Sequence, residues 1–272
     1  MRSKAFLKSI VPPMLWNVGR DLKRRLLRSD DEYAYAPGGW DTPLPGGVRN
    51  EDYWNAFIAH DRTACEAMMA RVKRGEPPLI GAEYELKHMT FAYVLAISAD
   101  GKERVTLLDY GGSLGDYFWH AKALLPRIDL EYHCKELPAI AEVGRQINPA
   151  VTWHTDDSCL RPAYDLVMFS SSLEYVKEWK DVLRRAADAA RRCLLLSDVP
   201  TVRHVPPFVA TERRGRVTNL HWQLNGSEVV DTVEAAGLRL HREFAMGPYP
   251  RISNAPEQPA SVGWLFRRET SP

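Results

Sequence analysis

The sequence has little of several features that define whole classes of proteins. It contains 4 cysteines in 272 residues, with no Cys-x-x-Cys pair and no histidine at metal spacing, which excludes a disulfide framework or a structural zinc as the basis of the fold. No stretch approaches the ~18 consecutive apolar residues of a membrane-spanning helix. Lysine and arginine (36) nearly balance aspartate and glutamate (35), so the chain lacks the basic field of a sequence-independent nucleic-acid binder. We therefore expect a cytoplasmic protein with reduced thiols, no metal and no bound nucleic acid.

The charge that is present lies unevenly along the chain. Residues 1–28 contain eight basic side chains and one acid, Asp21, so their net charge of +7 leaves −6 for the rest of a chain whose total is +1. Apolar side chains, Trp16 among them, are interleaved with these bases, and Pro12-Pro13 precedes an expected helix over 14–28. Two interpretations stay open. The segment either contacts an anionic membrane at its inner face or packs as a docking helix on its own domain.

Changes in sequence pattern divide the chain into three parts. Residues 1–49 hold the basic amphipathic segment and a turn-rich stretch, PGGWDTPLPGG, at 37–47. In residues 50–103, apolar side chains recur at helical spacing over 54–72 and 83–97, which predicts a helical cap or lid. Residues 104–272 form the third part, which we expect to be an α/β domain.

From residue 104 onward, short apolar runs alternate with helical patterns. We expect strands at 105–109, 129–134, 151–154, 164–169, 193–197, 238–244 and 261–266, and helices at 116–125, 138–147, 178–190 and 227–236. Short buried strands that alternate with helices predict a doubly wound α/β fold, in which helices cover both faces of a mostly parallel, seven-stranded sheet.

The turn after the first of these strands carries the strongest functional signal. It reads Asp109-Tyr110-Gly111-Gly112-Ser113-Leu114-Gly115, and its glycines let the backbone pass close to a ligand. In an open parallel sheet, this turn is where a nucleotide-like ligand meets backbone N–H groups. Glu136 stands just beyond the second strand, where a carboxylate can accept both hydroxyls of a ribose. The sequence therefore predicts a nucleoside site.

The same turn favours a ligand without phosphate. A dinucleotide site has glycine at the positions of Ser113 and Asp116, and Asp116 would repel a pyrophosphate at the helix N-terminus. The P-loop pattern is absent. S-adenosylmethionine, which carries an ammonium and a sulfonium, suits the turn better because Asp109 and Asp116 can offset positive charge.

At this point the sequence resembles the class I S-adenosylmethionine-dependent methyltransferases. Asp109-x-Gly111-x-Ser113-x-Gly115 is similar to the first motif of that family, with Ser113 in place of the middle glycine. The stretches LLDYGGSLGDYF, KELP, FSSSLEYV and LLLSDVPT resemble methyltransferases encoded among bacterial surface-polysaccharide and other biosynthetic genes. That group often has arginine after the aspartate that follows the fifth strand, where this chain has Val199, so we expect the substrate side to differ.

The resemblance implies a set of cofactor contacts. It assigns the methionine end to Asp109 and to the turn with Gly111, Gly112, Ser113 and Gly115, the ribose to Glu136, the adenine amino group to Asp156 or Asp157, and the sulfonium to Ser170 and Ser171. The last four residues also have ordinary structural interpretations, as solvated turn residues or as partners of backbone groups at a strand end.

A general base is needed only where the acceptor must lose a proton, since alignment and exclusion of water can supply most of the catalysis of methyl transfer. We expect His221, in a stretch after the fifth strand, to be that base, and we regard His204, His88 and His120 as weaker candidates. Tyr175 and Trp222 are expected to line the acceptor pocket, although both could be ordinary core aromatics.

Three functions remain open on the sequence alone. The first is S-adenosylmethionine-dependent methyl transfer to a small-molecule or glycan-like acceptor, at oxygen, under a lid of N-terminal helices. The second is a catalytically silent module that docks on a membrane or a partner enzyme through residues 1–28. The third is an NAD-dependent oxidoreductase, which Ser113 and Asp116 oppose. Because fold does not fix the reaction, the acceptor is inferred from the resemblance alone.

Overall fold

The computed structural model describes residues 31–44, 54, 58–78, 85–214 and 217–269. The predicted amphipathic helix of residues 14–28 and its membrane contact lie outside these described residues. Among the helices that are described, none is long and apolar enough to cross a membrane.

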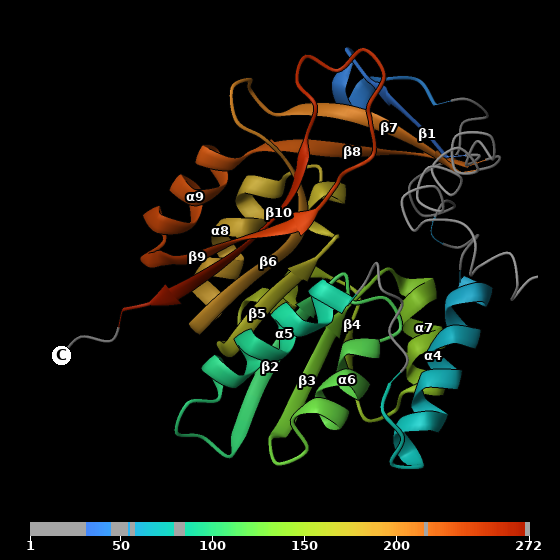
Figure 1. The fold of residues 1–272 in the computed structure, drawn as a ribbon, viewed down its shortest axis with the longest axis vertical. Helices are drawn as coiled ribbons and strands as arrows, with labels where there is room; N and C mark the ends of the chain where they lie inside the picture. Colours follow the sequence, from blue (N-terminus) through green and yellow to red (C-terminus); the bar gives the residue numbers. More distant parts are fainter. Residues whose placement is uncertain (1–30, 45–53, 55–57, 79–84, 215–216, 270–272) are drawn as a thin grey trace, which may run out of the picture.

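A parallel sheet forms the centre of the molecule (Figure 1). Its strands are β2 (Arg104–Tyr110), β3 (Asp129–Lys135), β4 (Thr152–His154), β5 (Tyr164–Ser170) and β6 (Ala190–Val202), in the order β6-β5-β2-β3-β4. β10 (Ala260–Arg268) pairs antiparallel with β6, and β9 (Leu238–Gly247) pairs antiparallel with β10. All seven predicted strands are present, which confirms the predicted fold class.

Helices cover both faces because successive side chains of each strand point to opposite faces. Leu107 of β2 packs in one core with α5 (Glu85–Ser98) and α6 (Asp116–Leu124), whereas Leu108 packs in another with α8 (Trp179–Ala189) and α9 (Gly226–Ala235). α7 (Pro138–Ile147) and α4 (Ile58–Lys73) share a smaller cluster beside α6.

The sheet continues into an antiparallel extension that the sequence did not reveal. It consists of β1 (Asp31–Tyr35), β7 (Phe208–Arg214) and β8 (Val217–Asn225), which we call the roof sheet. β5 last pairs with β6 at Ser197, and β8 takes up parallel pairing with β6 at Thr201 and Val202. Because β10 holds the other edge of β6 at Thr201, the roof sheet starts where β5 ends (Figure 1).

Two parts of the expected domain division differ in the structure. β1 lies within residues 1–49, yet it pairs with β7 through the register Tyr33–Glu212. α5 was expected in a lid, but Phe91, Val94 and Leu95 are buried against the parallel sheet. α5 is therefore a layer of the α/β domain. The first part of the chain also contacts the roof sheet through a 3-10 turn at Gly39–Asp41, which lies against β7.

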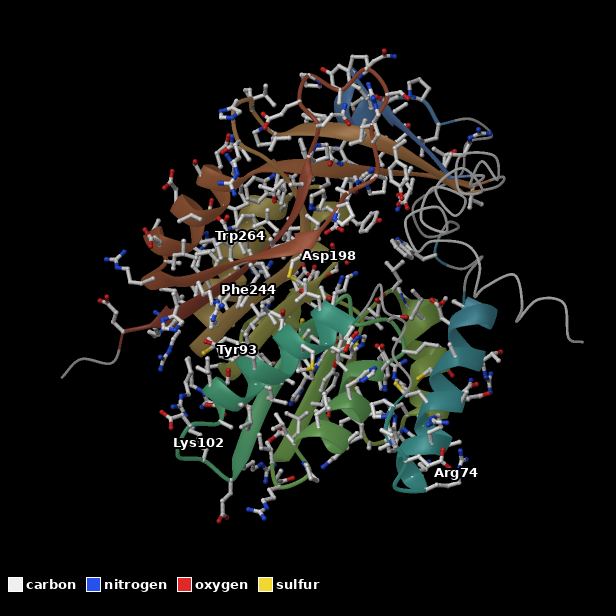
Figure 2. The ribbon with its side chains drawn as sticks, viewed as in Figure 1. Arg74, Tyr93, Lys102, Asp198, Phe244 and Trp264 are labelled. Atoms are coloured by element: carbon white, nitrogen blue, oxygen red, sulfur yellow. The ribbon has the colours of Figure 1, made fainter. Side chains whose placement is uncertain are left out.

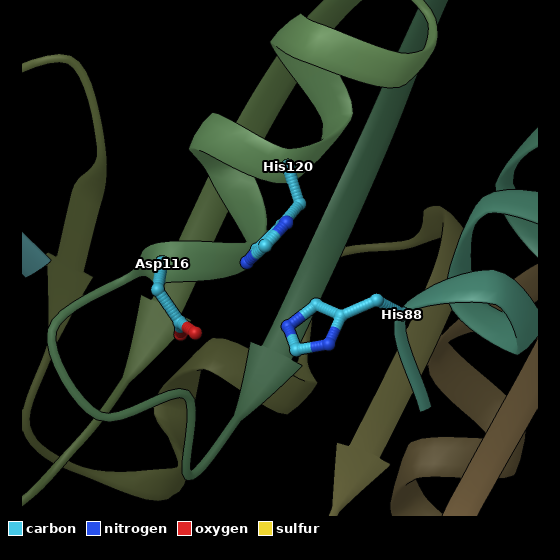
Figure 3. Close-up of side chains that lie close together, drawn as sticks. All are labelled: His88, Asp116 and His120. Carbon is cyan, nitrogen blue, oxygen red and sulfur yellow. The ribbon is translucent and has the colours of Figure 1, made fainter. Parts of the chain in front are cut away.

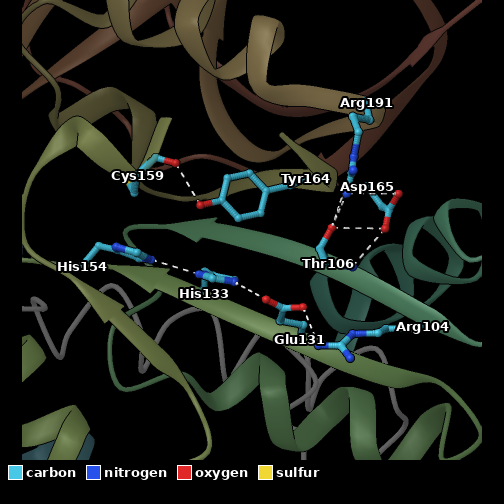
Figure 4. Close-up of polar contacts among 9 residues, drawn as sticks. All are labelled: Arg104, Thr106, Glu131, His133, His154, Cys159, Tyr164, Asp165 and Arg191. Atoms are coloured by element: carbon cyan, nitrogen blue, oxygen red, sulfur yellow. Dashed lines mark hydrogen bonds and ion pairs between the residues drawn. The ribbon is translucent and has the colours of Figure 1, made fainter. Parts of the chain in front are cut away.

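A polar cluster on the sheet contributes to the fold (Figure 4). The Asp165 carboxylate accepts hydrogen bonds from the Thr106 N–H (3.0 Å) and Oγ1 (3.2 Å), and His133 Nδ1 lies 3.0 Å from His154 Nε2. These contacts join β2 to β5 and β3 to β4. None of the nine residues drawn in Figure 4 lines the cavity described next.

Candidate functional site

A cavity of about 780 Å³ opens at the carboxyl ends of the parallel strands, between them and the roof sheet. The order of the strands reverses between β2 and β5, and such a switch point is where open α/β sheets bind ligands. The volume is within the usual range for a small-molecule site. Its floor half is lined by Tyr110, Gly111, Ser113, Leu114, Lys135, Glu136, Leu137, Ile140, Ser170, Ser171 and Ser172, and its roof half by Tyr33, Glu174, Tyr175, Glu212, Met246, Pro248, Tyr249 and Pro250.

The glycine turn takes backbone conformations and close contacts that side chains would prevent. Gly111 has φ +77°, and a Cβ built there would stand 2.5 Å from the Cβ of Ser172. A Cβ at Gly112 would stand 2.2 Å from Asp109 Oδ2 and 2.8 Å from Cys134 Sγ. The turn thus presents bare backbone at Gly111 to the cavity and packs on its own strand at Gly112.

Asp109 lies beneath this turn and is not part of the cavity wall. Its side chain is fully buried and accepts a hydrogen bond from the Tyr132 hydroxyl, while Oδ1 has no hydrogen-bond partner among the described residues. Burial raises the pKa of the carboxyl to about 8, and the Tyr132 hydrogen bond opposes that rise. In this structure Asp109 supports the turn from below.

Glu136 lies on the wall of the floor half and ties the turn to α7. Its Oε1 accepts a hydrogen bond from the Ser113 N–H (2.9 Å), and Oε2 accepts one from the Leu137 N–H (2.8 Å). Burial raises its pKa, and the two backbone bonds counteract part of the rise. The carboxylate is therefore fixed in direction, and its remaining lone pairs are available to hydroxyl donors.

Ser170 and Ser171 follow β5 and also lie on the wall. Ser170 Oγ is 2.9 Å from the Tyr117 hydroxyl. Ser171, at φ +51°, accepts a hydrogen bond from Lys87 Nζ (2.8 Å) and donates one to Asp198 Oδ2 (2.7 Å). Lys87 and Asp198 form an ion pair across the cavity edge, where Figure 2 shows Asp198 between the parallel sheet and the roof sheet.

The two aspartates after β4 lie away from the cavity wall. Asp156 is exposed and caps the turn Asp157–Leu160 by accepting the Ser158 N–H (2.8 Å). Asp157 accepts a hydrogen bond from the Tyr110 hydroxyl (2.7 Å) and lies 3.8 Å from Arg185 Nη1. Neither carboxylate lines the cavity, so their predicted contact with adenine is not part of the geometry seen here.

Tyr175 lies on the wall, as expected, within a carboxylate network that the sequence did not indicate. Its hydroxyl donates to Glu212 Oε2 (2.8 Å), and the Tyr33 hydroxyl donates to Glu212 Oε1 (2.7 Å). Glu212 comes from β7 and is only 1% exposed. Two phenol donors on two oxygens suit an ionised carboxylate, which only accepts hydrogen bonds.

The expected positions of His221 and Trp222 were wrong. Both residues belong to strand β8 and not to a loop. His221 is fully buried behind the cavity wall, with Nδ1 3.1 Å from Gln223 Nε2. Side chains alternate along a strand, so Trp222 points the other way, donates to the Lys177 carbonyl (3.1 Å) and packs on Trp40. His204 is exposed and also lies off the wall.

His88 and His120 meet near the start of α6 (Figure 3). Together with Asp116 they could hold a metal ion, because one potential ligand atom from each lies within 4.8 Å of the others. The two ring centroids lie 3.8 Å apart with their planes tilted by 44°, and burial lowers the pKa of His120 to about 3. None of the three residues lines the cavity, so neither histidine is placed to act as the expected base.

Several wall residues were missed because their signals are not local. Lys87, Glu174, Glu212 and Tyr249 come from α5, the turn Leu173–Tyr175, β7 and the segment after β9. Glu174 lies inside the FSSSLEYV stretch already singled out, so its position two residues after the last serine was the one available signal.

Comparison with known proteins shows the fold. No protein-family model matches the sequence, and no curated protein matches it. A magnesium protoporphyrin IX methyltransferase from Synechocystis, solved with bound S-adenosylmethionine, is 14% identical and superimposes with a TM-score of 0.51 over 83% of this chain and 100% of that one. An O-methyltransferase family protein from Burkholderia thailandensis is 17% identical, with a TM-score of 0.47 over 95% of this chain and 71% of that one. The first likeness establishes a common Rossmann-like fold.

Proposed function

We propose that this protein transfers a methyl group from S-adenosylmethionine to a small-molecule acceptor. The observation that carries the proposal is the meeting of the glycine turn, Glu136 and the Ser170–Ser172 run on one wall of a cavity at the switch point of the sheet. The solved methyltransferase with the same fold contains S-adenosylmethionine, which supports this choice of cofactor.

The residues of the floor fit such a nucleoside. A Cβ at Gly111 would collide with Ser172, so glycine lets the turn pack closely on the Ser170–Ser172 run and present its backbone at the cavity wall to the methionine end of the cofactor. Glu136 is held rigidly by backbone N–H groups and can accept the ribose hydroxyls. When bound, S-adenosylmethionine supplies a methyl carbon that is already activated by its sulfonium.

The roof half then receives the acceptor, for which we propose a glycan-like molecule methylated at a hydroxyl oxygen. Tyr175 lies on this wall and already donates its own proton toward Glu212. While the acceptor oxygen takes up the methyl group, its hydroxyl proton would pass to the Tyr175 oxygen, and Tyr175 would give its own proton to Glu212. This pair replaces the buried His221 as the route for the proton.

The remaining wall residues align the acceptor and exclude water. The Trp54 ring meets the Tyr175 ring edge-on, with centroids 4.9 Å apart. Lys87 and Asp198 close the junction between floor and roof through Ser171. The fixed groups on these walls favour an in-line approach of the hydroxyl, which is the main requirement for methyl transfer.

Calorimetric titration with S-adenosylhomocysteine and with NAD tests the cofactor. We expect S-adenosylhomocysteine to bind, and Glu136→Ala to weaken it by about 1–3 kcal/mol, because charge-assisted hydrogen bonds to the ribose are lost. Glu142→Ala, an exposed change on α7, is the matched control and should bind normally. Tight binding of NAD without any response to S-adenosylhomocysteine would refute the proposal.

A further inference from the structure

Glu174 is a buried carboxyl group, and one of its two oxygens has no hydrogen-bond partner among the described residues. It lies on the cavity wall in the turn Leu173–Tyr175 and is only 3% exposed. Its Oε2 atom has no hydrogen-bond partner among the described residues. A buried polar group without a partner is costly, so a group that enters the cavity is the natural partner for this oxygen.

The neighbouring charges do not provide that partner. Glu174 interacts electrostatically with Asp198 and Lys87 on the floor side and with Glu212 of the roof sheet. Lys87 is already paired with Asp198, and Glu212 adds a second negative charge. Tyr249, from the segment after β9, faces Glu174 and is partly buried. The surroundings of Glu174 are therefore acidic and lack an uncommitted cation among the described residues.

Aromatic rings complete this part of the wall. Tyr33, Trp54, Tyr175 and Tyr249 all line the cavity. Tyr33 and Tyr249 meet edge-on with centroids 6.3 Å apart, as do Trp54 and Tyr175 at 4.9 Å. The faces of such rings carry partial negative charge and attract cations, and the attraction is larger where water is excluded.

The charged side chains on the described part of the wall also favour a cationic ligand. Among the described residues, five carboxyl side chains line the cavity (Asp61, Glu136, Glu174, Asp198 and Glu212), against two lysines. The second lysine, Lys135, lies 4.4 Å from the centre of the Tyr110 ring in the floor half. An anionic acceptor would meet uncompensated negative charge in the roof half, whereas a cation would relieve it.

We propose that the roof half binds the acceptor through a protonated amino group, which pairs with Glu174 and lies among the rings of Tyr33, Trp54, Tyr175 and Tyr249. The ligand class is a hydroxylated amine, such as an amino sugar or an amino alcohol. This inference rests on the proposed function for the hydroxyl that is methylated, while the binding of the amino group can be tested without any turnover.

The state of Glu174 gives the binding a pH signature. Burial raises the pKa of this carboxyl to about 8, so the neutral acid prevails at pH 6 in the free protein. An ammonium group favours the ionised form, and binding must then displace a proton. The apparent affinity for an amine should therefore rise about ninefold from pH 6 to 7 and about fivefold from pH 7 to 8, in proportion to the ionised fraction of Glu174.

Three ring compounds of similar size and different charge test the proposal. Cyclohexylamine, cyclohexanol and cyclohexanecarboxylate are titrated by ligand-observed NMR into protein saturated with S-adenosylhomocysteine. We expect the amine to bind at least tenfold more tightly than the alcohol at pH 8, and the carboxylate not to bind. The amine stays protonated between pH 6 and 8, as an alkylamine of the lysine type, so a rise in its affinity over this range reports on the protein.

Glu174→Gln removes the charge and keeps the shape of the side chain. We expect it to abolish the preference for the amine and to leave the alcohol unchanged, whereas Glu178→Gln, an exposed change on the same segment, should behave as the wild type. Equal binding of amine and alcohol, or an unchanged preference in Glu174→Gln, overturns the proposal. If that variant does not fold, the pH profile of the wild type decides, because a flat profile for the amine contradicts pairing with Glu174.

The same samples separate this inference from the proposed function. Saturation with S-adenosylhomocysteine is checked before each titration, and failure at that step rejects the cofactor assignment. Normal binding of S-adenosylhomocysteine together with no preference for the amine rejects only the cationic acceptor.

Discussion

The floor and the roof of the cavity hold their carboxylates in different ways. In the floor, Glu136 is bound by the backbone N–H groups of Ser113 and Leu137, which lie 23 and 1 residues away in the sequence. In the roof, Glu212 is bound by the side chains of Tyr33 and Tyr175, which lie 179 and 37 residues away. The floor is built from main chain that one βαβ unit supplies, and the roof from side chains that several distant segments supply.

This difference indicates which part of the cavity wall can accept substitutions and which part cannot. Backbone donors are the same for any side chain, so a floor made of them suits an invariant cosubstrate. Side-chain partners change with single substitutions, so a roof made of them can be adapted to a particular acceptor without disturbing the sheet. Substitutions in the roof should therefore alter turnover and leave cofactor binding intact, while substitutions in the floor should affect cofactor binding and folding.

Tyr175→Phe should have the largest effect and should be confined to the chemistry. Loss of the phenol removes the proton route to Glu212, and we expect single-turnover methylation of a hydroxylated amine to fall by about 10²–10⁴-fold. The affinity for S-adenosylhomocysteine should not change. Tyr33→Phe removes the other hydrogen bond to Glu212 and is the matched control, with a loss of less than about tenfold. Equal losses in the two variants would show that the phenols only support Glu212.

Gly112→Ala should disrupt the packing of the floor and lower the stability of the protein. The new methyl carbon would stand 2.2 Å from Asp109 Oδ2 and 2.8 Å from Cys134 Sγ, and forced shifts in such a packed region cost about 1–3 kcal/mol of unfolding free energy. We expect lower stability in urea and weaker binding of S-adenosylhomocysteine. Gly112 lies outside the left-handed region, so its cost comes from packing, whereas Gly75→Ala has open space around the new carbon and only the strain of φ +74°. A Gly112→Ala protein as stable as the wild type would contradict the observed packing.

The same contrast explains which parts could be predicted from the sequence. Short apolar strands, helical spacing and the glycine turn are local patterns, so the parallel sheet and the floor residues Gly111, Ser113 and Glu136 followed from them. Their positions on the wall depend on neighbours in a single βαβ unit. The predicted roles of these residues toward a cofactor stay predictions until the titrations are made.

The roof could not be predicted in this way because its contacts join segments that are far apart in the sequence. β7 and β8 follow β6 closely and form a hairpin, whereas we expected the stretch around His221 to be a loop from its place after the fifth strand, although its polar and apolar side chains alternate. Those polar side chains, Asn219, His221 and Gln223, are buried in the roof sheet. Pairing of β1 with β7 joins residues about 180 positions apart, and no local pattern specifies such a contact.

The stability of the roof should depend on pH through Glu174. Its folded pKa of about 8 exceeds the ~4.3 of an unfolded glutamate, so the folded state binds the proton more tightly. The resulting stabilisation is complete below pH 4 and is lost as pH rises toward 8. Asp109 shows the same direction in the floor. In Glu174→Gln, we expect the unfolding free energy relative to the wild type to increase by at least about 1 kcal/mol from pH 5 to pH 8.

Urea unfolding at several pH values measures this change, with Glu178→Gln as the exposed control. A fixed offset between Glu174→Gln and the wild type at all pH values would show that the carboxyl is not protonated in the folded protein. The acidic roof would then carry its full charge at neutral pH, and binding of an amine would release no proton.

Substitution of His221 should have the smallest effect. It tests whether a residue behind the cavity wall only positions the wall residues or takes part in the chemistry. The His221 ring lies behind the wall, with centroids 5.9 Å from those of both Tyr33 and Tyr175, and Nδ1 contacts Gln223. It is a positioning residue in this geometry, so His221→Asn should lower turnover by less than about tenfold and leave the pH profile unchanged. A base would instead contribute about 10²–10⁴-fold. Measurement of single-turnover rates across pH decides between the two roles, because loss of the pH dependence together with a large drop in rate would return the proton transfer to His221.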